Sequence, residues 1–423
     1  MRWLLNAALV VGGLIWLGLT FRAQLAEILA GTAGFDFHNY YYSTKAFRFH
    51  GASIYDHEAM SALSREEQGT PWVPPYVYPP YLTVPFLPLV SLRYETVRVL
   101  WLLLSYGFLF GTFEAMRRLC VFVGKRPVDW RLTWLVPIFA ASLFSPLLEH
   151  NWYGQSNLLV LVLLSWGIYL EWKRPFRFPV GELLLATAGL LKLFPMFLFP
   201  CYLAMRRYRT VGAIAGWSVL LTGMTLLFIP FGEFLRFPEV LNASMYVATS
   251  QEHFYQDHSA SSALRYLIAP AAVPAVAIFL VRFVPYGGYL AAFRAEAGRP
   301  GRLGMAHLLR LSQAFVLLSF VMFRWWEHHL VMLFFPCFIA AYECSRAPRA
   351  RVAPAVCLAA SAAYIGIVYH PALRDWLGQY LEAAMQGKLA AQLILFGVLE
   401  YLIRKPFPTA DGEQPPQARS AKA

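Results

Sequence analysis

The chain has 423 residues with a formal net charge of +12, and 58% of the residues are apolar while only 14% are charged. Soluble globular domains carry about 25% charged residues, so this composition excludes an ordinary soluble domain and indicates a polytopic membrane protein. The lysines and arginines occur in short clusters between apolar runs, which is typical of the loop bias that orients membrane proteins and not of a nucleic-acid-binding surface.

Ten stretches are long and apolar enough to be predicted as membrane helices, because a helix needs about 20 residues to cross the hydrocarbon core. The first is longer than the apolar region of a signal peptide and no A-x-A site follows it closely, so we expect an uncleaved first helix. The predicted spans are 3–21, 97–116, 131–148, 156–172, 210–230, 264–284, 305–323, 328–345, 351–370 and 385–403.

Two further apolar stretches do not fit simple spans. Residues 80–92 are short and rich in proline, and residues 182–204 are interrupted by a lysine and a proline. Basic clusters flank 182–204 at both ends and should face the cytoplasm, so we expect this stretch to enter and leave on one side as a buried re-entrant hairpin. We expect 80–92 not to cross completely; alternatively, both pieces contain short helices. The sequence thus predicts an all-α, polytopic transmembrane bundle with about 10–13 membrane helices and both termini in the cytoplasm.

The longest segment expected on the extracytoplasmic face is residues 22–96, which is rich in Tyr, Trp and Pro. Its amphipathic stretches 37–50 and 57–67 predict two short helices on the membrane surface, the first ended by Gly51. The predicted domain organisation is one integral-membrane domain over residues 1–405 and a disordered tail over residues 406–423.

An acid and several aromatic residues begin this outer segment: Asp36 is followed by His38 and by three consecutive tyrosines at 40–42. A carboxylate at the level of the lipid headgroups is a candidate general base. The alternative is that Asp36 caps a helix beginning at Phe37. The tyrosines can line a sugar-sized pocket or anchor the helix in the interface, and at helical spacing they cannot all face one way.

A short outer turn, HNWYGQSN over residues 150–157, joins two predicted spans, and Gly154 supplies the turn. Gln155 and Asn157 can hydrogen-bond sugar hydroxyls. The alternative is that they only cap the next helix.

Lys192 interrupts the apolar run LLKLFP. A lysine at membrane depth is costly and is therefore a functional candidate. From the tip of a hairpin it can reach a phosphate; the alternative is a structural ion pair with Glu182 or Glu149.

The stretch QDHSASSALRYL, residues 256–267, places His258, Ser262 and Arg265 at the start of a span. A serine and an arginine near a helix N-terminus can hold a phosphate. Capping by a serine, with Arg265 extending to the interface, is the alternative.

The densest polar cluster is FRWWEHHLVML, residues 323–333. Its two tryptophans suit the membrane interface. On a helix His328 and His329 point about 100° apart, a poor arrangement for shared metal ligation, so a hydrogen-bonding or phosphate role fits better. A polar interfacial turn that includes Glu327 is the alternative.

The polar groups named above gather on the predicted outer face, which suggests a site that opens outward. No Walker loop, Rossmann fingerprint or GxSxG elbow is present, so a nucleotide substrate is unsupported. The five cysteines form no CxxC pair and predict buried free thiols, not a metal site or a disulfide framework.

The order of these motifs resembles glycosyltransferase family 87 over about residues 30–335. This family of multi-spanning GT-C enzymes includes the polyprenol-phosphate-mannose-dependent α-mannosyltransferases of bacteria. The resemblance rests on Asp36, Gly51–Tyr55, VYPPY at 77–81, GQSN at 154–157, LLKLFP at 190–195, Arg265 and WEHH at 326–329.

The resemblance implies roles for individual residues. Asp36 would deprotonate the acceptor hydroxyl, and a single in-line attack would invert the anomeric carbon. The residues expected near the donor phosphate are Lys192, Arg265, His328 and His329. The residues expected to contact the sugar or the acceptor are His38, Tyr41, Tyr78, Gln155, Asn157, His258 and Glu327. Many GT-C enzymes carry two neighbouring acids in the first loop, whereas here Phe37 follows Asp36, so we expect no metal and no cofactor.

The expected function is transfer of a sugar, most simply mannose, from a polyprenyl-phosphate donor to a lipid, glycolipid or lipoglycan acceptor. The expected location is the bacterial plasma membrane, with the active site on the extracytoplasmic side. One alternative is a lipid or solute transporter or flippase, which would favour internal repeats and polar groups at the midplane. Another is a GT-C enzyme that uses a different lipid-phosphate sugar.

Overall fold

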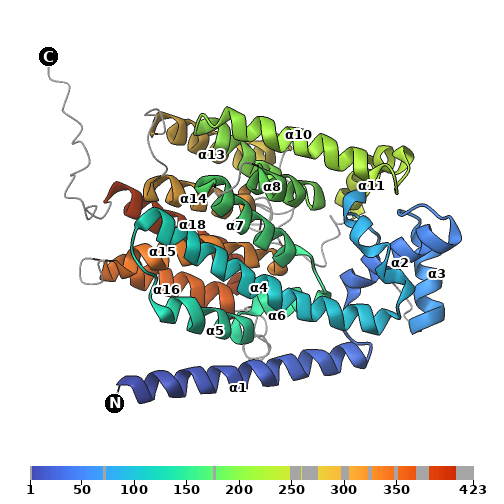
Figure 1. The fold of residues 1–423 in the computed structure, drawn as a ribbon, viewed down its shortest axis with the longest axis horizontal. Coiled ribbons are helices and arrows are strands. Elements are labelled where there is room, and N and C mark those ends of the chain that lie inside the picture. Colours follow the sequence, from blue (N-terminus) through green and yellow to red (C-terminus); the bar gives the residue numbers. More distant parts are fainter. Residues whose placement is uncertain are drawn as a thin grey trace.

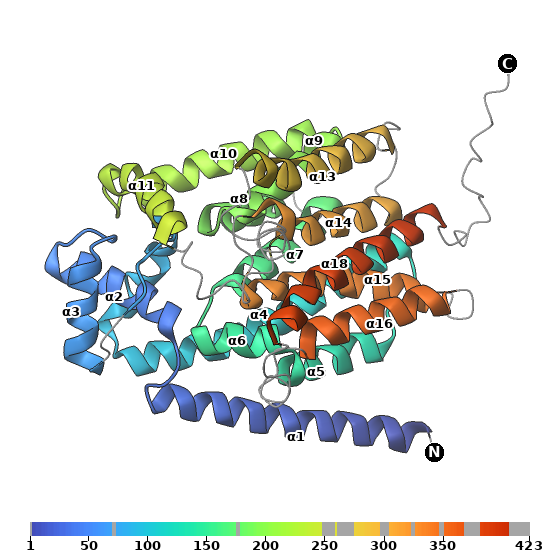
Figure 2. The same cartoon turned by 180° about the vertical axis from the view of Figure 1, so that it is seen from behind.

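The structure is a computed structural model that describes residues 2–69, 73–174, 178–247, 259, 275–296, 304–322, 326–346, 351–367 and 381–405. These residues form a helical bundle with a small helical cap at one end (Figures 1 and 2). The first half comprises α1 (Arg2–Leu29), α2 (Phe35–His50), α3 (His57–Gln68), the short turns η1 (Pro80–Leu82), η2 (Val84–Phe86) and η3 (Leu89–Ser91), α4 (Tyr94–Gly124), η4 (Arg131–Leu135), α5 (Val136–Leu143), α6 (Ser145–Tyr153) and α7 (Asn157–Lys173). The second half comprises α8 (Val180–Leu191), η5 (Phe194–Leu198), α9 (Phe199–Ala204), α10 (Tyr208–Thr225), α11 (Phe231–Val247), α13 (Ala275–Glu296), α14 (Met305–Val321), η8 (Glu327–Leu333), α15 (Phe334–Ser345), α16 (Val352–Ile367) and α18 (Leu381–Arg404).

The two predicted surface helices are present as α2 and α3, which form the cap. Gly51 ends α2 with a φ of 65°, a conformation that glycine adopts without strain. α2 begins at Phe35 with Gly34 as its N-cap, at a φ of 106°. Asp36 therefore lies inside the first turn and does not cap the helix, so the capping alternative for Asp36 is wrong.

Three helical stretches are long and apolar enough to cross a membrane: Ala7–Leu29 within α1, the whole of α4, and Glu327–Ser345 formed by η8 and α15. The bent pair η4–α5 and α6 makes a fourth if it is counted as one span. Helices also lie at the other predicted spans (Figure 1). The prediction of an all-α polytopic membrane protein is confirmed, and the number of crossings, 10–13, stays a prediction.

Large apolar side chains face outward from the bundle. Leu14, Ile15 and Leu19 on α1 are exposed, as are Val219 and Leu220 on α10. Soluble proteins rarely expose large contiguous apolar patches. These faces instead suit contact with lipid.

The helix α6 differs from the predicted outer turn over residues 150–157, because the helix extends to Tyr153. The chain bends by 62° between α5 and α6. Pro146 lies in the first turn of α6, where its missing N–H removes no intrahelical bond. Gly154 ends α6 with a φ of 74°, in agreement with the predicted turn glycine.

The helix α13 runs past the end of the span predicted over residues 264–284, of which residues 264–274 lie outside the described part of the chain. It continues through Pro285 because side chains beyond that proline are packed inside the protein. Tyr289 and Phe293 are buried, and the Tyr289 hydroxyl donates to the carbonyl of Arg310 at 2.6 Å. Tertiary packing thus outweighs the local proline.

Residues 182–204 fold back on themselves, as predicted for a re-entrant hairpin. α8 packs along α7, and the chain then returns through η5 and α9. The ring of Phe199 on the returning arm lies against Gly189 on the outgoing arm, where a Cβ atom would be 3.0 Å from the ring. Lys192 lies at the tip, in extended conformation just after α8.

Both ends of this hairpin meet the same end of α7. The backbone of Gly181, at the start of α8, approaches Glu171 in the last turns of α7. Arg207, just after α9, forms an ion pair with the Glu171 carboxylate at 2.6 Å. The tip instead reaches the first residue of α7, because Lys192 donates to Asn157 at 2.6 Å. The two ends of the hairpin therefore lie together at one end of α7, an arrangement compatible with the predicted return to one side of the membrane.

The described members of several basic clusters meet at the bundle end away from α2 and α3 (Figure 1). The Tyr342 hydroxyl donates to the carbonyl of Arg126 at 3.2 Å, which joins the ends of α15 and α4. Arg351 pairs with Glu343 at 2.7 Å and donates to the carbonyl of Lys405 at 3.0 Å. These clusters share one end of the bundle, as the predicted topology requires.

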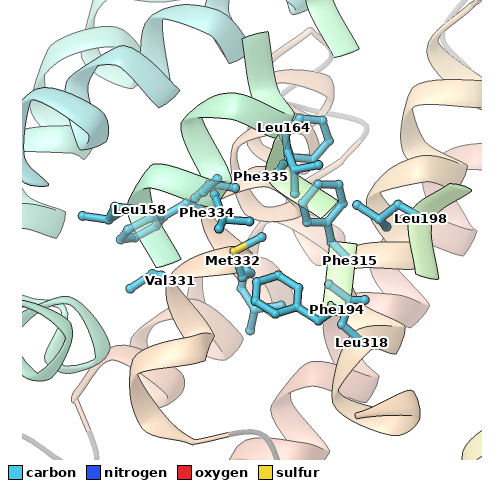
Figure 3. Packing of buried hydrophobic residues seen from close by; sticks show 14 of the residues in the cluster. Leu158, Leu164, Phe194, Leu198, Phe315, Leu318, Val331, Met332, Phe334 and Phe335 are labelled. Atoms are coloured by element: carbon cyan, nitrogen blue, oxygen red, sulfur yellow. The ribbon is translucent and has the colours of Figure 1, made fainter. Parts of the chain in front are cut away.

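One continuous apolar core joins the hairpin to the helices around it (Figure 3). Phe194 and Leu198 of η5 belong to this core together with Leu318 of α14 and Met332 of η8. The hairpin tip is thereby held inside the bundle, which fixes the position of Lys192.

Candidate active site

Gln155 is the centre of a buried polar cluster. Its Nε2 donates to Oδ2 of Asp36. Its Oε1 accepts from the Lys192 ammonium at 3.0 Å, from the Tyr78 hydroxyl at 3.3 Å and from the Tyr40 hydroxyl at 3.4 Å. These side chains come from α2, the segment before η1, the α6–α7 turn and the hairpin tip. Segments distant in sequence thus meet at one amide.

The turn between α6 and α7 holds Gln155 against α2. A side chain at Gly154 would lie 2.6 Å from Cβ of Phe37, so glycine is required both by its φ of 74° and by this close approach. Trp101 of α4 donates to the Gln155 carbonyl at 3.3 Å. Arg98, which is fully buried, donates to the last carbonyls of α6. The turn is therefore fixed by α2 and α4 together.

The first turn of α7 is capped by His150 and not by Gln155 or Asn157. The first turn of α7 has no side-chain cap from its N-cap residue Ser156. His150 accepts instead from the backbone N–H of Leu158 at 3.1 Å, through Nε2. The two amide side chains are directed at Asp36 and Lys192, and capping does not explain them.

Lys192 is buried and makes a second hydrogen bond besides the one to the glutamine. It donates to Oδ1 of Asn157 at 2.6 Å, and Nδ2 of Asn157 donates to the carbonyl of His328 at 3.0 Å. Amide oxygens accept its hydrogen bonds, rather than the carboxylates of Glu182 or Glu149 that the structural alternative predicts. The hairpin tip is thereby tied to η8.

Asp36 lies on α2, which is not among the candidate spans, and protein covers most of its side chain. Burial raises the pKa of Asp36 to about 6, while the hydrogen bond from Gln155 and the charge of Lys192 lower it. A carboxyl with this pKa is largely ionised at neutral pH and still accepts a proton more readily than an ordinary aspartate. This is the behaviour of a general base.

His38 joins α2 to α4. Its Nδ1 lies 2.8 Å from the carbonyl oxygen of Gly34 and 3.1 Å from the Tyr94 hydroxyl, and its ring stacks on Tyr42. Burial lowers the pKa of His38 to about 4, so the ring is neutral at pH 7. These contacts account for its position within the cap, and its sugar-binding role stays a prediction.

Tyr40, rather than Tyr41, reaches the cluster around Asp36. The Tyr41 hydroxyl donates to the carbonyl of Leu92 at 2.6 Å. Tyr41 lines a separate groove of about 590 Å³ between α2, α3 and the start of α4. Successive residues of a helix point about 100° apart, so Tyr41 faces this groove and not Asp36. A sugar that contacts Tyr41 would therefore lie in the groove.

The two histidines of WEHH differ in their surroundings. The ring of His328 is tilted against Tyr153, and its backbone carbonyl accepts from Asn157. Nδ1 of His329 accepts from the backbone N–H of Trp326 at 3.1 Å, and its ring meets Phe194 of the hairpin edge-on. Both histidines border the hairpin tip, which brings them to the same region as Lys192.

Glu327 is fully buried and forms an ion pair with Lys388 of α18, which is also fully buried. The Ser145 hydroxyl donates to the same carboxylate at 3.0 Å. Glu149 lies within electrostatic range of this pair and of Asp36. Glu327 thus connects α6, η8 and α18, and its predicted contact with the sugar or acceptor stays a prediction.

Arg265 and His258 lie outside the residues that the structure describes, so their predicted roles remain untested. Among the described residues, no group of three or more His, Cys, Asp or Glu side chains is arranged to hold a metal ion.

Several residues of this region are not found by motif alone. Arg98 and Lys388 each lie within an apolar run, and that position is the signal that marks a lysine or arginine for inspection. Tyr40 is one of three tyrosines in a row, and only the direction of α2 distinguishes it. Trp101 contributes through a backbone carbonyl, which no side-chain pattern reveals.

The fold and the cluster define a polytopic membrane protein in which a largely covered carboxyl group and a buried ammonium group are joined through one amide. The model of glycosyltransferase family 87 matches residues 76–335, which is more than half of the chain. The chain belongs to glycosyltransferase family 87. The match includes Tyr78, Gln155 and Lys192 but begins after Asp36. It therefore starts later than the resemblance predicted from the sequence, which began at about residue 30.

A curated relative is the polyprenol-phosphate-mannose-dependent alpha-(1-2)-phosphatidylinositol pentamannoside mannosyltransferase of Mycobacterium tuberculosis (strain CDC 1551 / Oshkosh). It is 25% identical over 180 residues, which are 42% of this chain and 40% of the relative. The chain therefore matches less than half of the relative's length. No solved structure matches the chain.

Proposed function

We propose that this glycosyltransferase moves a mannosyl residue from a polyprenyl-phosphate donor to a hydroxyl of a glycolipid or lipoglycan acceptor. The family supports a glycosyltransferase, and the name of the mycobacterial relative supports the donor and the sugar. The observation that carries the proposal is the joining of Asp36 to Lys192 through Gln155. This arrangement sets a proton acceptor beside a buried cation.

In the proposed reaction Asp36 is the general base. One Asp36 oxygen takes the proton of the acceptor hydroxyl as the acceptor oxygen bonds to the anomeric carbon. The bond from that carbon to the phosphate oxygen breaks, and its electron pair leaves with the polyprenyl phosphate. A single in-line displacement of this kind inverts the anomeric carbon.

Lys192 is the proposed partner of the donor phosphate. A lysine ammonium has three N–H groups, and two of them donate to Gln155 and Asn157. The third can donate to a phosphate oxygen as negative charge develops on it. A cation held in a buried site stabilises such charge more strongly than one in water. His328, His329 and Arg265 are proposed to contribute to the same phosphate site.

The proposed location is the bacterial plasma membrane, with the site on the extracytoplasmic side. Basic loops face the cytoplasm in membrane proteins, and the described basic clusters meet at the end opposite the cap. The cap formed by α2 and α3 would then lie outside, where a lipid-linked sugar is accessible. No metal or cofactor is proposed.

The proposal is tested by reconstituting the purified protein with radiolabelled polyprenyl-phosphate-mannose and candidate acceptors, phosphatidylinositol mannosides first. We expect transfer by the wild type and none by Asp36→Asn. Identical elution of both proteins in size-exclusion chromatography would show that the substitution leaves the fold intact.

Parallel reactions with polyprenyl-phosphate-arabinose and polyprenyl-phosphate-glucose identify the donor sugar. Turnover only with one of these would replace mannose in the proposal. Near-normal transfer by Asp36→Asn would remove Asp36 from the role of base.

A further inference from the structure

We infer that Gln155 is a positioning residue for Asp36 rather than a ligand of the sugar. The inference rests on the proposed function, in which Asp36 is the base. It assigns to the glutamine of GQSN a role other than the sugar contact that the sequence predicts.

The surroundings of Gln155 leave its amide little access to a substrate. The residue is 3% exposed, and both ends of the amide have protein partners. Oε1 accepts from Lys192, Tyr78 and Tyr40. An amide oxygen has two lone pairs, so three donors already exceed what it accepts at full strength.

The chemistry of these partners fixes which way the amide faces. A lysine ammonium only donates hydrogen bonds, so it must meet the oxygen of the amide. An ionised carboxylate only accepts, so Asp36 must meet the NH₂ group. Rotating the amide by 180° would set an NH₂ group against the ammonium and an oxygen against the carboxylate. Lys192 therefore holds the amide in the one orientation that donates to Asp36.

This hydrogen bond acts on Asp36 in two ways. It orients the carboxylate by occupying Oδ2, so that the other oxygen remains for the acceptor hydroxyl. It also favours the ionised form, because a donor stabilises a carboxylate more than a carboxylic acid. Asp36 thereby remains a base at neutral pH although burial opposes its ionisation.

Other titratable or charged groups lie around this part of α2. Burial, Gln155 and Lys192 set the pKa of Asp36, so the experiment has to separate Gln155 from Lys192 and from the other ionisable groups nearby. The titratable or charged groups are His38 and Tyr40 on α2, Tyr78 before η1, Arg98 on α4, Glu149 and His150 on α6, and Lys192 at the hairpin tip.

The test compares wild type with Gln155→Met and Gln155→Glu. Methionine has a similar length and cannot donate to Asp36. The acid limb of the kcat–pH profile should therefore shift to higher pH by about one unit. KM for donor and acceptor should stay close to wild type. Glutamate places a second carboxyl beside Asp36, and the limb should move up further because two carboxylates at one site do not readily both ionise.

Tyr78→Phe is the matched control. It removes one of three donors to Oε1 and leaves the Nε2 donation to Asp36, so the acid limb should move less than in Gln155→Met. A rise in KM in Gln155→Met with an unchanged acid limb would overturn the inference and restore a sugar contact.

A second measurement needs no turnover. Infrared titration follows the carboxylic-acid carbonyl band that Asp36→Asn removes, in wild type and in both Gln155 variants. We expect this band to disappear at a higher pH in the variants. The same titration pH in all three proteins would overturn the inference, whether or not the protein transfers mannose.

Discussion

Lys192 and Asp36 meet the two ends of one amide: the ammonium donates to Oε1 of Gln155, and Nε2 of Gln155 donates to the Asp36 carboxylate. Lys192 lies at the tip of a hairpin inside the bundle, whereas Asp36 lies in the first turn of a cap helix. The contact joins the cap to the membrane domain. A movement of the hairpin tip would therefore reach the carboxyl that the proposed reaction uses.

The activity should depend on pH through Asp36. Burial raises the pKa of Asp36 to about 6, and the base acts only in its ionised form. The rate should therefore fall as pH decreases through about 6 and reach a plateau above it. A pH profile of single-turnover transfer measures this. Full activity at pH 5, with the protein still folded, would contradict a base with this pKa.

Removing the Lys192 charge should slow the chemical step. Lys192→Met loses the proposed contact with the leaving phosphate, and the loss of one such donor lowers kcat by about 10²–10³-fold. Lys192→Arg keeps the charge but presents a planar fork in place of three rotating N–H groups, so we expect partial activity. Rapid-quench measurement of both variants distinguishes them. Equal losses in the two variants would indicate that packing, not charge, is what matters.

Two neighbouring tyrosines provide a matched comparison. Tyr40→Phe removes a donor to Gln155, whereas Tyr41→Phe removes a donor to the carbonyl of Leu92. A single hydrogen bond contributes about 0.5–1.5 kcal/mol, and this 3.4 Å bond shares its acceptor with two other donors, so we expect Tyr40→Phe to lower kcat about two- to threefold. Tyr41→Phe should keep kcat. The opposite order in a steady-state assay would support the sugar-binding role predicted for Tyr41.

The buried pair of Glu327 and Lys388 should determine stability. Lys388→Met leaves a buried carboxylate without its cation, which costs about 3–5 kcal/mol. Lys388→Met combined with Glu327→Gln removes both charges and should recover much of this loss. Thermal unfolding in detergent, followed by intrinsic fluorescence, measures both proteins. If Glu327→Gln alone raises KM without loss of stability, Glu327 contacts the substrate as the sequence predicts.

Apolar length and charge placement determine much of the fold without any tertiary information. A run of about 20 apolar residues has few stable forms other than a helix in lipid, so the membrane helices follow from composition. Basic residues at both ends of 182–204 predict that the segment turns back, and in the structure both of its ends lie near Glu171. Local turn chemistry likewise predicts Gly51 and Gly154, because both require a positive φ.

The contacts within the site required the tertiary structure. The sequence alone determined that a carboxyl, an amide pair and an intramembrane lysine are present, at Asp36, Gln155, Asn157 and Lys192. Only the packing of α2 on the α6–α7 turn and of the hairpin on η8 decided that these groups meet, and that Tyr40 rather than Tyr41 joins them. The reason is physical: periodicity states which residues share a face of one helix, but the rotation and depth of helices relative to one another depend on packing between distant segments.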